Sequence, residues 1–333
     1  MPRGPSRTPC QGLPALLVAL IGMAIALGAC GGELNPNGAK GLRIGFVPKS
    51  LNQEYWVNTR HGADVGGQSA HAKVLTQAGQ DDTQILEQIN IVQNLIAEKV
   101  NALVIAPDDS NLLLPILNKA ARKIPVVLFD SDIAGWKHKT AYVGTQNYAG
   151  GLLMGKYLAK QIRGGTLAII TGIPGSQVGI DRVNGVVAGI KGAGIKVVKQ
   201  VNGNFDREQS VGAMDDILQT NPKISAVFCA NDQEALGALQ SLVARNLTGK
   251  VKLVGFDGAL EAAQAIIAKK MYATIAQAPY DMGRIAVEEA AAAIQHRRVN
   301  PNVNTGATLV TQQDAQAYFN RVQSKLGAGT SKH

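Results

Sequence analysis

From residue 42 onward, short apolar runs alternate with longer segments of helical periodicity, and this alternation restricts the possible folds more than any other feature. The run LRIGFV is followed by one such segment. The next one, TQILEQINIVQNLIAEK, places Ile85, Ile89, Val92 and Ile96 on one helix face. Strands that alternate with helices form parallel sheets with helices on both faces. The sequence therefore predicts an α/β protein.

The alternating pattern occurs twice along the chain. One series ends near residue 145, and a similar series begins with the run GTLAIITG at residue 165. A helical segment, GRIAVEEAAAAIQH, and a strand, GATLVT, follow the second series. Because 333 residues suffice for two domains, we expect two doubly wound parallel-sheet lobes. The sequence has no fixed short-period repeat of the kind that indicates a solenoid.

Residues 1–29 have the composition of a secretion signal rather than of a folded domain. Arg3 and Arg7 precede the apolar run LPALLVALIGMAIALGAC, which ends in small residues. The last four residues of that run resemble the lipobox of bacterial lipoproteins, which implies that Cys30 is lipidated and becomes the new N-terminus. Residues 30–41 then form a flexible tether. The alternative is cleavage by the ordinary signal peptidase, which leaves Cys30 free.

The charges and the cysteines argue against several other classes of protein. The formal net charge is +9, and without the two leader arginines 31 basic residues stand against 24 acidic ones. The charges are scattered along helix faces without a basic block, which argues against a nucleic-acid partner. No later segment has the length of a membrane span, so the lipid anchor is the only expected membrane contact. Cys229 lies alone in the run ISAVFCAN and is expected to be a buried apolar residue.

Polar and aromatic side chains follow the apolar runs, at the point where each predicted strand ends. In open α/β sheets, ligands lie beyond the carboxyl ends of the strands. Carboxylates, amides and arginine bind vicinal hydroxyl groups, while aromatic rings cover the C–H faces of a sugar ring. The residues at the strand ends include Lys49, Gln53, Tyr55, Trp56, Asp130, Asp132, Arg182, Phe205, Asn231, Asp257 and Gln277. This mixture favours a sugar as the ligand.

Four segments carry a specific resemblance: NFDREQ, VFCANDQEALGAL, LVGFDG and ATIAQAP. They resemble the ribose-binding branch of the type I periplasmic sugar-binding proteins of ABC importers, and the likeness runs from about residue 42 to 322. The family fold has two lobes that are joined by three strands and close on the sugar as a hinge. The implied divisions are a first lobe of 42–145 plus 279–305, a second lobe of 146–278 plus 306–325, a tail of 326–333, and crossings near residues 145–147, 277–279 and 305–306.

The resemblance also implies roles for the residues at the strand ends. Tyr55 and Trp56 stand where two stacking aromatic residues stand in the family. Gln53 stands where an amide is found, and Asp130 matches the first-lobe carboxylate that chelates neighbouring hydroxyl groups. The implied contacts from the second lobe and the hinge are Arg182, Phe205, Asn231, Asp257 and Gln277.

The first lobe departs from the ribose-binding pattern. Lys49 replaces a small hydroxyl residue, Ala106 replaces an asparagine, and Ser131 replaces an arginine. The segments VPK and DSD look instead like the binding proteins for rhamnose and for the furanosyl signalling sugar. The second lobe is therefore ribose-like and the first is not, and the choice among pentose, hexose, deoxyhexose and polyol stays open.

Three residues of the first lobe have alternative roles. Lys49 is either a solvated lysine at the rim or, as we expect, the partner of Asp130 or Asp132. Trp56 is equally consistent with a ligand contact and with the core. Asp132 is also left open as a ligand contact.

Residues of the second lobe have alternatives too. Phe205 has a core alternative and Arg182 a helix-surface alternative. Asp232 is expected to cap a helix that starts at the next residue. Asn231 and Asp257 are expected to have no packing role.

We therefore expect a receptor without catalytic activity or cofactor. It would bind a monosaccharide outside the cytoplasm as a monomer and deliver it to an ABC permease and its ATPase. The alternative is a sugar sensor that presents its closed form to a chemoreceptor or a sensor kinase. The sequence lacks a Gly-x-Ser-x-Gly elbow, its five histidines follow no metal-ligand spacing, and TGIPGSQVG lacks the features of a nucleotide loop. A LacI-type repressor would need a helix-turn-helix where this chain has a leader.

Overall fold

The structure is a computed structural model that describes residues 41–162 and 164–330. The leader, Cys30 and the tether up to residue 40 lie outside the described residues, and their assignment stays a prediction. Within the described stretches, no helix combines the length and the hydropathy that crossing a membrane requires.

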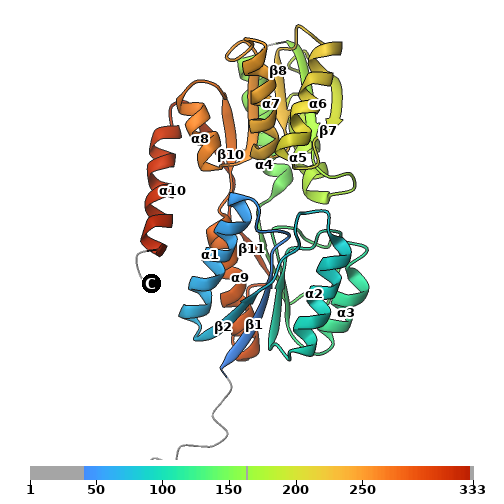
Figure 1. Ribbon diagram of the computed structural model, residues 1–333, viewed down its shortest axis with the longest axis vertical. Coiled ribbons are helices and arrows are strands. Elements are labelled where there is room, and N and C mark those ends of the chain that lie inside the picture. The colour runs from blue at the N-terminus through green and yellow to red at the C-terminus, as the bar shows by residue number, and fades with distance from the viewer. Residues whose placement is uncertain (1–40, 163, 331–333) are drawn as a thin grey trace, which may run out of the picture. The chain divides into compact units, whose positions relative to one another are not determined.

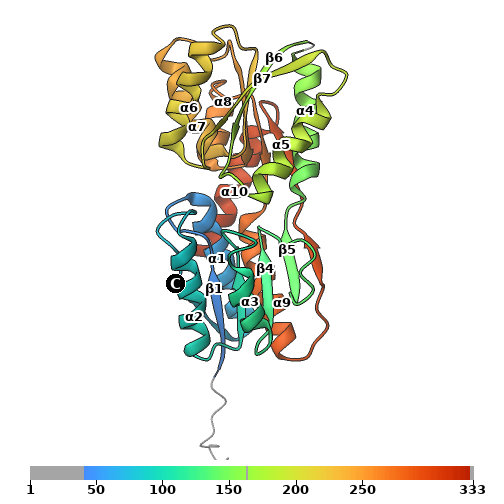
Figure 2. The ribbon, with the colours of Figure 1, turned by 90° about the vertical axis from the view of Figure 1, so that its right-hand side faces the viewer.

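The first lobe is built on a six-stranded sheet in which every strand pair is parallel. Its strands are β1 (Leu42–Val47), β2 (Ala72–Thr76), β3 (Ala102–Ile105), β4 (Val126–Phe129), β5 (Ala141–Gly144) and β11 (Asn302–Asn304). They lie in the order β11-β5-β4-β3-β1-β2. The covering helices are α1 (Glu54–Ser69), α2 (Ile85–Ala97), α3 (Leu114–Ala121) and α9 (Pro279–Ile294). Helices α1 and α9 pack on one face and α2 and α3 on the other (Figures 1 and 2).

The second lobe repeats this plan with one antiparallel edge strand. Its strands are β6 (Gly165–Thr171), β7 (Ile195–Asn202), β8 (Ala226–Cys229), β9 (Lys252–Asp257), β10 (Ala273–Ala276) and β12 (Thr308–Thr311). The order is β12-β10-β9-β8-β6-β7, and β12 runs antiparallel to β10. The helices are α4 (Asn147–Gln161), α5 (Gln177–Gly189), α6 (Arg207–Thr220), α7 (Asp232–Ala244), α8 (Leu260–Ile267) and α10 (Ala315–Thr330). Cys229 is fully buried among them, as expected.

The chain passes between the two sheets three times. The crossings lie between β5 and α4, between β10 and α9, and between β11 and β12. Sequential strands that lie next to one another in parallel bring their carboxyl ends to one edge of each sheet. The two edges that carry the predicted ligand residues therefore face each other across the crossings.

Two elements of the structure were not expected from the sequence. Strand β11 adds three residues to the edge of the first sheet beside β5. Helix α10 begins at Ala315, packs against α8 and continues to Thr330. Figure 1 shows α10 leaving the second lobe and running beside α1 of the first. The helix therefore spans the side of the molecule where the chain crosses between the lobes.

Glycines allow pairs of helices to approach closely in both lobes. In the first lobe, a Cβ added at Gly62 of α1 would lie 1.8 Å from the carbonyl oxygen of Tyr280, which belongs to α9. In the second lobe, a Cβ at Gly151 of α4 would lie 2.2 Å from the carbonyl oxygen of Arg182 in α5. These glycines therefore fix the distance between neighbouring helix backbones, although they lower helix propensity.

Candidate ligand-binding site

Nine of the eleven predicted residues surround one small cavity between the two lobes. The cavity has a volume of about 30 Å³, and Asp82 and Val178 complete its wall. The nine are Lys49, Gln53, Tyr55, Trp56, Asp130, Arg182, Phe205, Asn231 and Asp257. Of the other two, Gln277 lines a neighbouring cavity on the side of the crossings, and Asp132 lines a third one. We call the space around the nine residues the cleft.

Asp257 organises the second-lobe side of the cleft. Its Oδ1 accepts hydrogen bonds from Arg182 Nη1 at 3.1 Å and from Gln277 Nε2 at 2.7 Å. Burial raises the pKa of Asp257 to about 6, and the positive charge of Arg182 opposes that rise. The carboxylate is therefore held by a cation from α5 and an amide from the crossing after β10.

Arg182 is a buried residue of this network, so its helix-surface alternative is wrong. Its side chain is 4% exposed, and its guanidinium lies 4.0 Å from the centre of the Phe256 ring. Nε donates to Asn147 Oδ1 at 2.9 Å, and Nη1 also donates to the Ala230 carbonyl at 2.8 Å. These contacts hold the planar guanidinium in one orientation toward the cleft.

Asp130 organises the first-lobe side. Its Oδ2 accepts a 2.7 Å hydrogen bond from the Tyr55 hydroxyl, and its Oδ1 accepts one of 2.8 Å from Ser131 Oγ. The Tyr55 hydroxyl also lies 3.5 Å from Gln277 Oε1, which links the two lobes. Burial, and then the charge of Asp130, raise the pKa of Tyr55, so that its hydroxyl remains a donor.

Three residues of the cleft have a backbone conformation that side chains rarely adopt. The φ angles are +60° for Asp130, +58° for Phe205 and +122° for Asp257. Such strained residues persist where the surrounding structure holds them, and they concentrate at ligand sites. The same three residues come from the strand ends that the sequence pattern selected.

Lys49 does not pair as expected. The residue is only 4% exposed, and its ammonium lies 6.0 Å from the centre of the Trp56 ring. That ammonium has no hydrogen-bond acceptor among the described residues. Asp132 is paired with Lys139 instead, and Asp130 is bonded to Tyr55 and Ser131. Lys49 is thus largely buried and is not the partner of either aspartate.

Two carboxylates near Lys49 were missed in the sequence. Asp82 accepts hydrogen bonds from Ser50 Oγ at 2.7 Å and from Trp56 Nε1 at 3.1 Å. Asp108 has two buried carboxylate oxygens without any hydrogen-bond partner. Burial raises the pKa of both groups, that of Asp108 to about 8, and the charge of Lys49 lowers both. They follow β2 and β3. The principle that ligands lie beyond the carboxyl ends of the strands, which we call the strand-end rule, would have found them if it had been extended to these two strands.

Trp56 and Phe205 combine the two roles between which the sequence could not decide. Trp56 packs edge-on against Phe129 in the first-lobe core, with ring centres 6.4 Å apart, and also lines the cleft. Phe205 packs against Val178 and Ala230 and lines the cleft as well. Each ring is therefore fixed by core packing on one side while it borders the cleft on another.

Asn231 has a structural role that was not expected. Its Oδ1 accepts from the Glu234 backbone N–H at 2.8 Å, and Glu234 Oε2 accepts from the Asn231 N–H at 3.0 Å, which forms a capping box at the start of α7. Its Nδ2 donates to the Phe205 carbonyl at 3.3 Å. Replacement by alanine would therefore remove a helix cap together with any ligand contact.

Asp232 does not cap the helix, contrary to expectation, because its neighbour takes that position. Its carboxylate accepts hydrogen bonds from the backbone N–H groups of Gly258 and Ala259, each at 2.8 Å. It also accepts one of 2.8 Å from Thr274 Oγ1. Asp232 thus joins the start of α7 to the loop after β9 and to β10.

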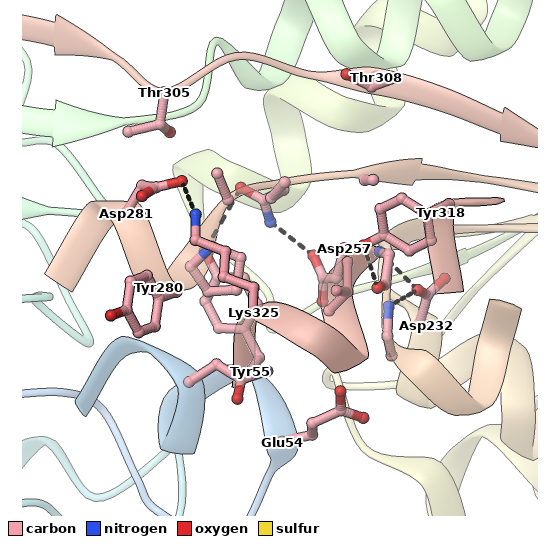
Figure 3. A pocket seen from close by; sticks show the side chains of 18 of the residues that line it. Glu54, Tyr55, Asp232, Asp257, Tyr280, Asp281, Thr305, Thr308, Tyr318 and Lys325 are labelled. Atoms are coloured by element: carbon pink, nitrogen blue, oxygen red, sulfur yellow. Dashed lines mark hydrogen bonds and ion pairs between the residues drawn. The ribbon is translucent and has the colours of Figure 1, made fainter. Parts of the chain in front are cut away.

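The larger cavity beside the crossings has a volume of about 250 Å³ and shares Gln53, Tyr55 and Asp257 with the cleft. Figure 3 shows Glu54 and Tyr55 on one side of it and Tyr318 on the other, with Lys325 reaching across to Asp281. The Lys325–Asp281 ion pair, at 2.6 Å, joins α10 to α9. Three residues of the cleft therefore also border this larger cavity, on the side where the chain crosses between the lobes.

Comparison with known proteins agrees with this geometry. Residues 44–298 match the periplasmic binding protein domain. The chain belongs to the periplasmic binding protein family. It is 31% identical to the ribose import binding protein of Bacillus subtilis, over 84% of this chain and 90% of that protein. It is 32% identical to the D-allose-binding periplasmic protein of Escherichia coli, over 71% and 79% of the two chains.

Two solved structures of periplasmic binding proteins are similar to this one. A solute-binding protein of Actinobacillus succinogenes with bound D-allose is 30% identical and gives a TM-score of 0.79 over 83% of this chain and all of that one. One from Agrobacterium radiobacter in complex with D-arabinose is 29% identical, with a TM-score of 0.80 over 85% and 99% of the two chains. The expected type I fold is thereby confirmed, and these relatives are solute-binding proteins of importers, not enzymes.

Proposed function

We propose that this periplasmic binding protein captures a monosaccharide between its lobes outside the cytoplasm and delivers it to an ABC import permease. The observation that carries the proposal is the cleft itself, where side chains from both lobes converge at the carboxyl ends of both sheets. Relatives named for ribose and allose, and neighbours that hold D-allose and D-arabinose, support the same class of ligand.

The chemistry of the cleft suits vicinal hydroxyl groups. Asp130 and Asp257 supply carboxylates from opposite lobes, and Arg182 supplies a planar donor that hydrogen bonds already orient. Trp56 and Phe205 offer apolar ring surfaces for the C–H face of a sugar. A ligand that contacts both lobes favours the closed arrangement, because those contacts exist only when the lobes are together.

The lobes must separate for a sugar to enter. The cleft cavity of about 30 Å³ has room for only a few water molecules. The lobes already meet across it, since Gln53 Nε2 lies 3.5 Å from the Phe205 carbonyl oxygen. We propose that the lobes, 42–145 plus 279–305 and 146–278 plus 306–325, rotate about the three crossings and that lipidated Cys30 anchors the chain to the membrane.

A thermal-shift screen of the chain from residue 41 onward tests the proposed function. The panel contains pentoses, hexoses, 6-deoxyhexoses and polyols, with amino acids as the control class. A ligand at 100 times its dissociation constant stabilises the native state by about 2.7 kcal/mol, so one group of sugars should raise the melting temperature by several degrees. A panel in which no sugar shifts the melting temperature, or in which only an amino acid does, would contradict sugar capture.

A further inference from the structure

Two ionisable groups of the first lobe, Lys49 and Asp108, have no hydrogen-bond partner among the described residues. Lys49 is 4% exposed and lines the cleft, but no acceptor contacts its ammonium. Both carboxylate oxygens of Asp108 are buried and receive no donor. Buried polar groups in folded proteins are almost always satisfied, and leaving one unpaired costs stability. These two groups are therefore places where a bound molecule can complete the hydrogen bonding.

Asp108 lines a cavity of about 110 Å³ that adjoins the cleft. The two cavities share Asp82 and Val178 in their walls. The first lobe contributes Asp108, Asp109, Ser131 and Asp132 to it, and residues 173–178 of the second lobe close it from the other side. We call this cavity the annex. Its volume is more than three times the 30 Å³ of the cleft cavity.

Lys49 and Asp108 influence each other without forming an ion pair. Burial raises the pKa of Asp82 and of Asp108, and the nearby charge of Lys49 opposes that rise in both. The ammonium needs an acceptor and the carboxyl group of Asp108 needs a donor or, when protonated, an acceptor. A hydroxyl group serves as both, whereas an ammonium group on the ligand could serve Asp108 only. The described residues contain no group of three or more potential ligands that could hold a metal ion there.

We propose that the ligand extends from the cleft past Lys49 and Asp82 into the annex, where a hydroxylated substituent beyond the sugar ring contacts Asp108. This inference rests on the proposed sugar-binding function and narrows it to a substrate class. A hexopyranose, which carries an exocyclic CH₂OH group, fits this arrangement, and the matching pentopyranose, which lacks that group, leaves Asp108 unsatisfied. Asp82 and Asp108 are then specificity-determining residues together with Lys49.

Matched sugar pairs test the proposal by titration calorimetry. D-Ribose and D-allose, D-xylose and D-glucose, and D-lyxose and D-mannose differ within each pair only by the exocyclic group. The wild-type protein should bind the hexose of its preferred pair at least tenfold more tightly than the pentose. Asp108→Leu should lower the hexose affinity at least tenfold and change the pentose affinity less than twofold. Asp108→Asn, of nearly the same size, guards against a folding defect of the leucine variant and should shift the hexose affinity in the same direction.

The matched control is Asp215→Asn, which changes an exposed carboxylate of α6 that is paired with Arg245. It should leave both affinities unchanged. If the Asp108 variants lose affinity for both sugars of a pair, or for neither of them, the annex is not a subsite. Sugar capture in the cleft would stand in either case. A wild-type protein that binds no sugar of any pair or panel would overturn the proposed function, and the annex with it.

Discussion

Replacing Asp257 with alanine is expected to lower the affinity for the sugar by about 100-fold or more. Hydrogen bonds to charged groups contribute about 1.5–3 kcal/mol each, so the loss of one or two of them lowers the affinity about 100-fold or more. The change also removes the acceptor that holds Arg182 and Gln277 in place. The affinity would be measured by titration calorimetry with the sugar that the screen selects.

The same substitution should destabilise the second lobe, because Arg182 is buried and would lose its carboxylate partner. Asp257→Asn separates the two effects, since it keeps an acceptor of the same size and removes the charge. Asp215→Ala, on the exposed side of α6, is the control for removal of a carboxylate that lies outside the cleft. Undiminished sugar binding by folded Asp257→Ala would show that the cleft is not the ligand site.

Gly62→Ala is expected to lower the free energy of unfolding by about 3 kcal/mol, the upper end of the usual range for overpacking. The added Cβ would lie 1.8 Å from the Tyr280 carbonyl oxygen, so the whole backbone of α1 or α9 must move. The contact is reciprocal, because a Cβ at Gly283 would lie 1.8 Å from the Thr59 carbonyl oxygen. Urea unfolding monitored by circular dichroism measures the effect.

Gly212→Ala supplies a control with the opposite expected sign. Gly212 lies within α6, and a Cβ there meets no atom within 4 Å. The alanine should raise the free energy of unfolding by about 0.4–1 kcal/mol, because it restricts the unfolded chain and favours the helix. If Gly62→Ala were as harmless as Gly212→Ala, α1 and α9 would not pack at the distance seen in the structure.

The strand-end rule located most of the cleft from sequence because its physical basis is general. Parallel strands bring their carboxyl ends to one edge, so residues as far apart as Asp130 and Asp257 face the same space once the two sheets are joined. Asp82 and Asp108 were missed because the rule was not applied after β2 and β3. Their burial and their position near Lys49 could not be inferred from local sequence.

Other errors arose where a distant partner decides the role of a residue. Asp232 looks like a helix cap locally, but its hydrogen-bond partners Gly258, Ala259 and Thr274 are 26, 27 and 42 residues away. Lys49 was expected to pair with Asp130 or Asp132, but Asp130 is bonded to Tyr55 and Ser131, and Asp132 pairs with Lys139, seven residues further along the chain. Helix α10, which was not expected, is fixed by its packing against α8. Such tertiary contacts override local preference.

Fluorescence of a single tryptophan tests sugar capture in the cleft most directly. The chain contains two tryptophans, Trp56 at the cleft and Trp136 in the core of the first lobe, so Trp136→Phe leaves Trp56 as the sole reporter. Titration of this variant with the sugar from the screen should change the Trp56 emission along a saturable curve, and the same titration of Trp136→Phe/Asp257→Ala should give no change. Sugar binding detected by calorimetry that leaves the Trp56 emission unaltered would place the ligand outside the cleft.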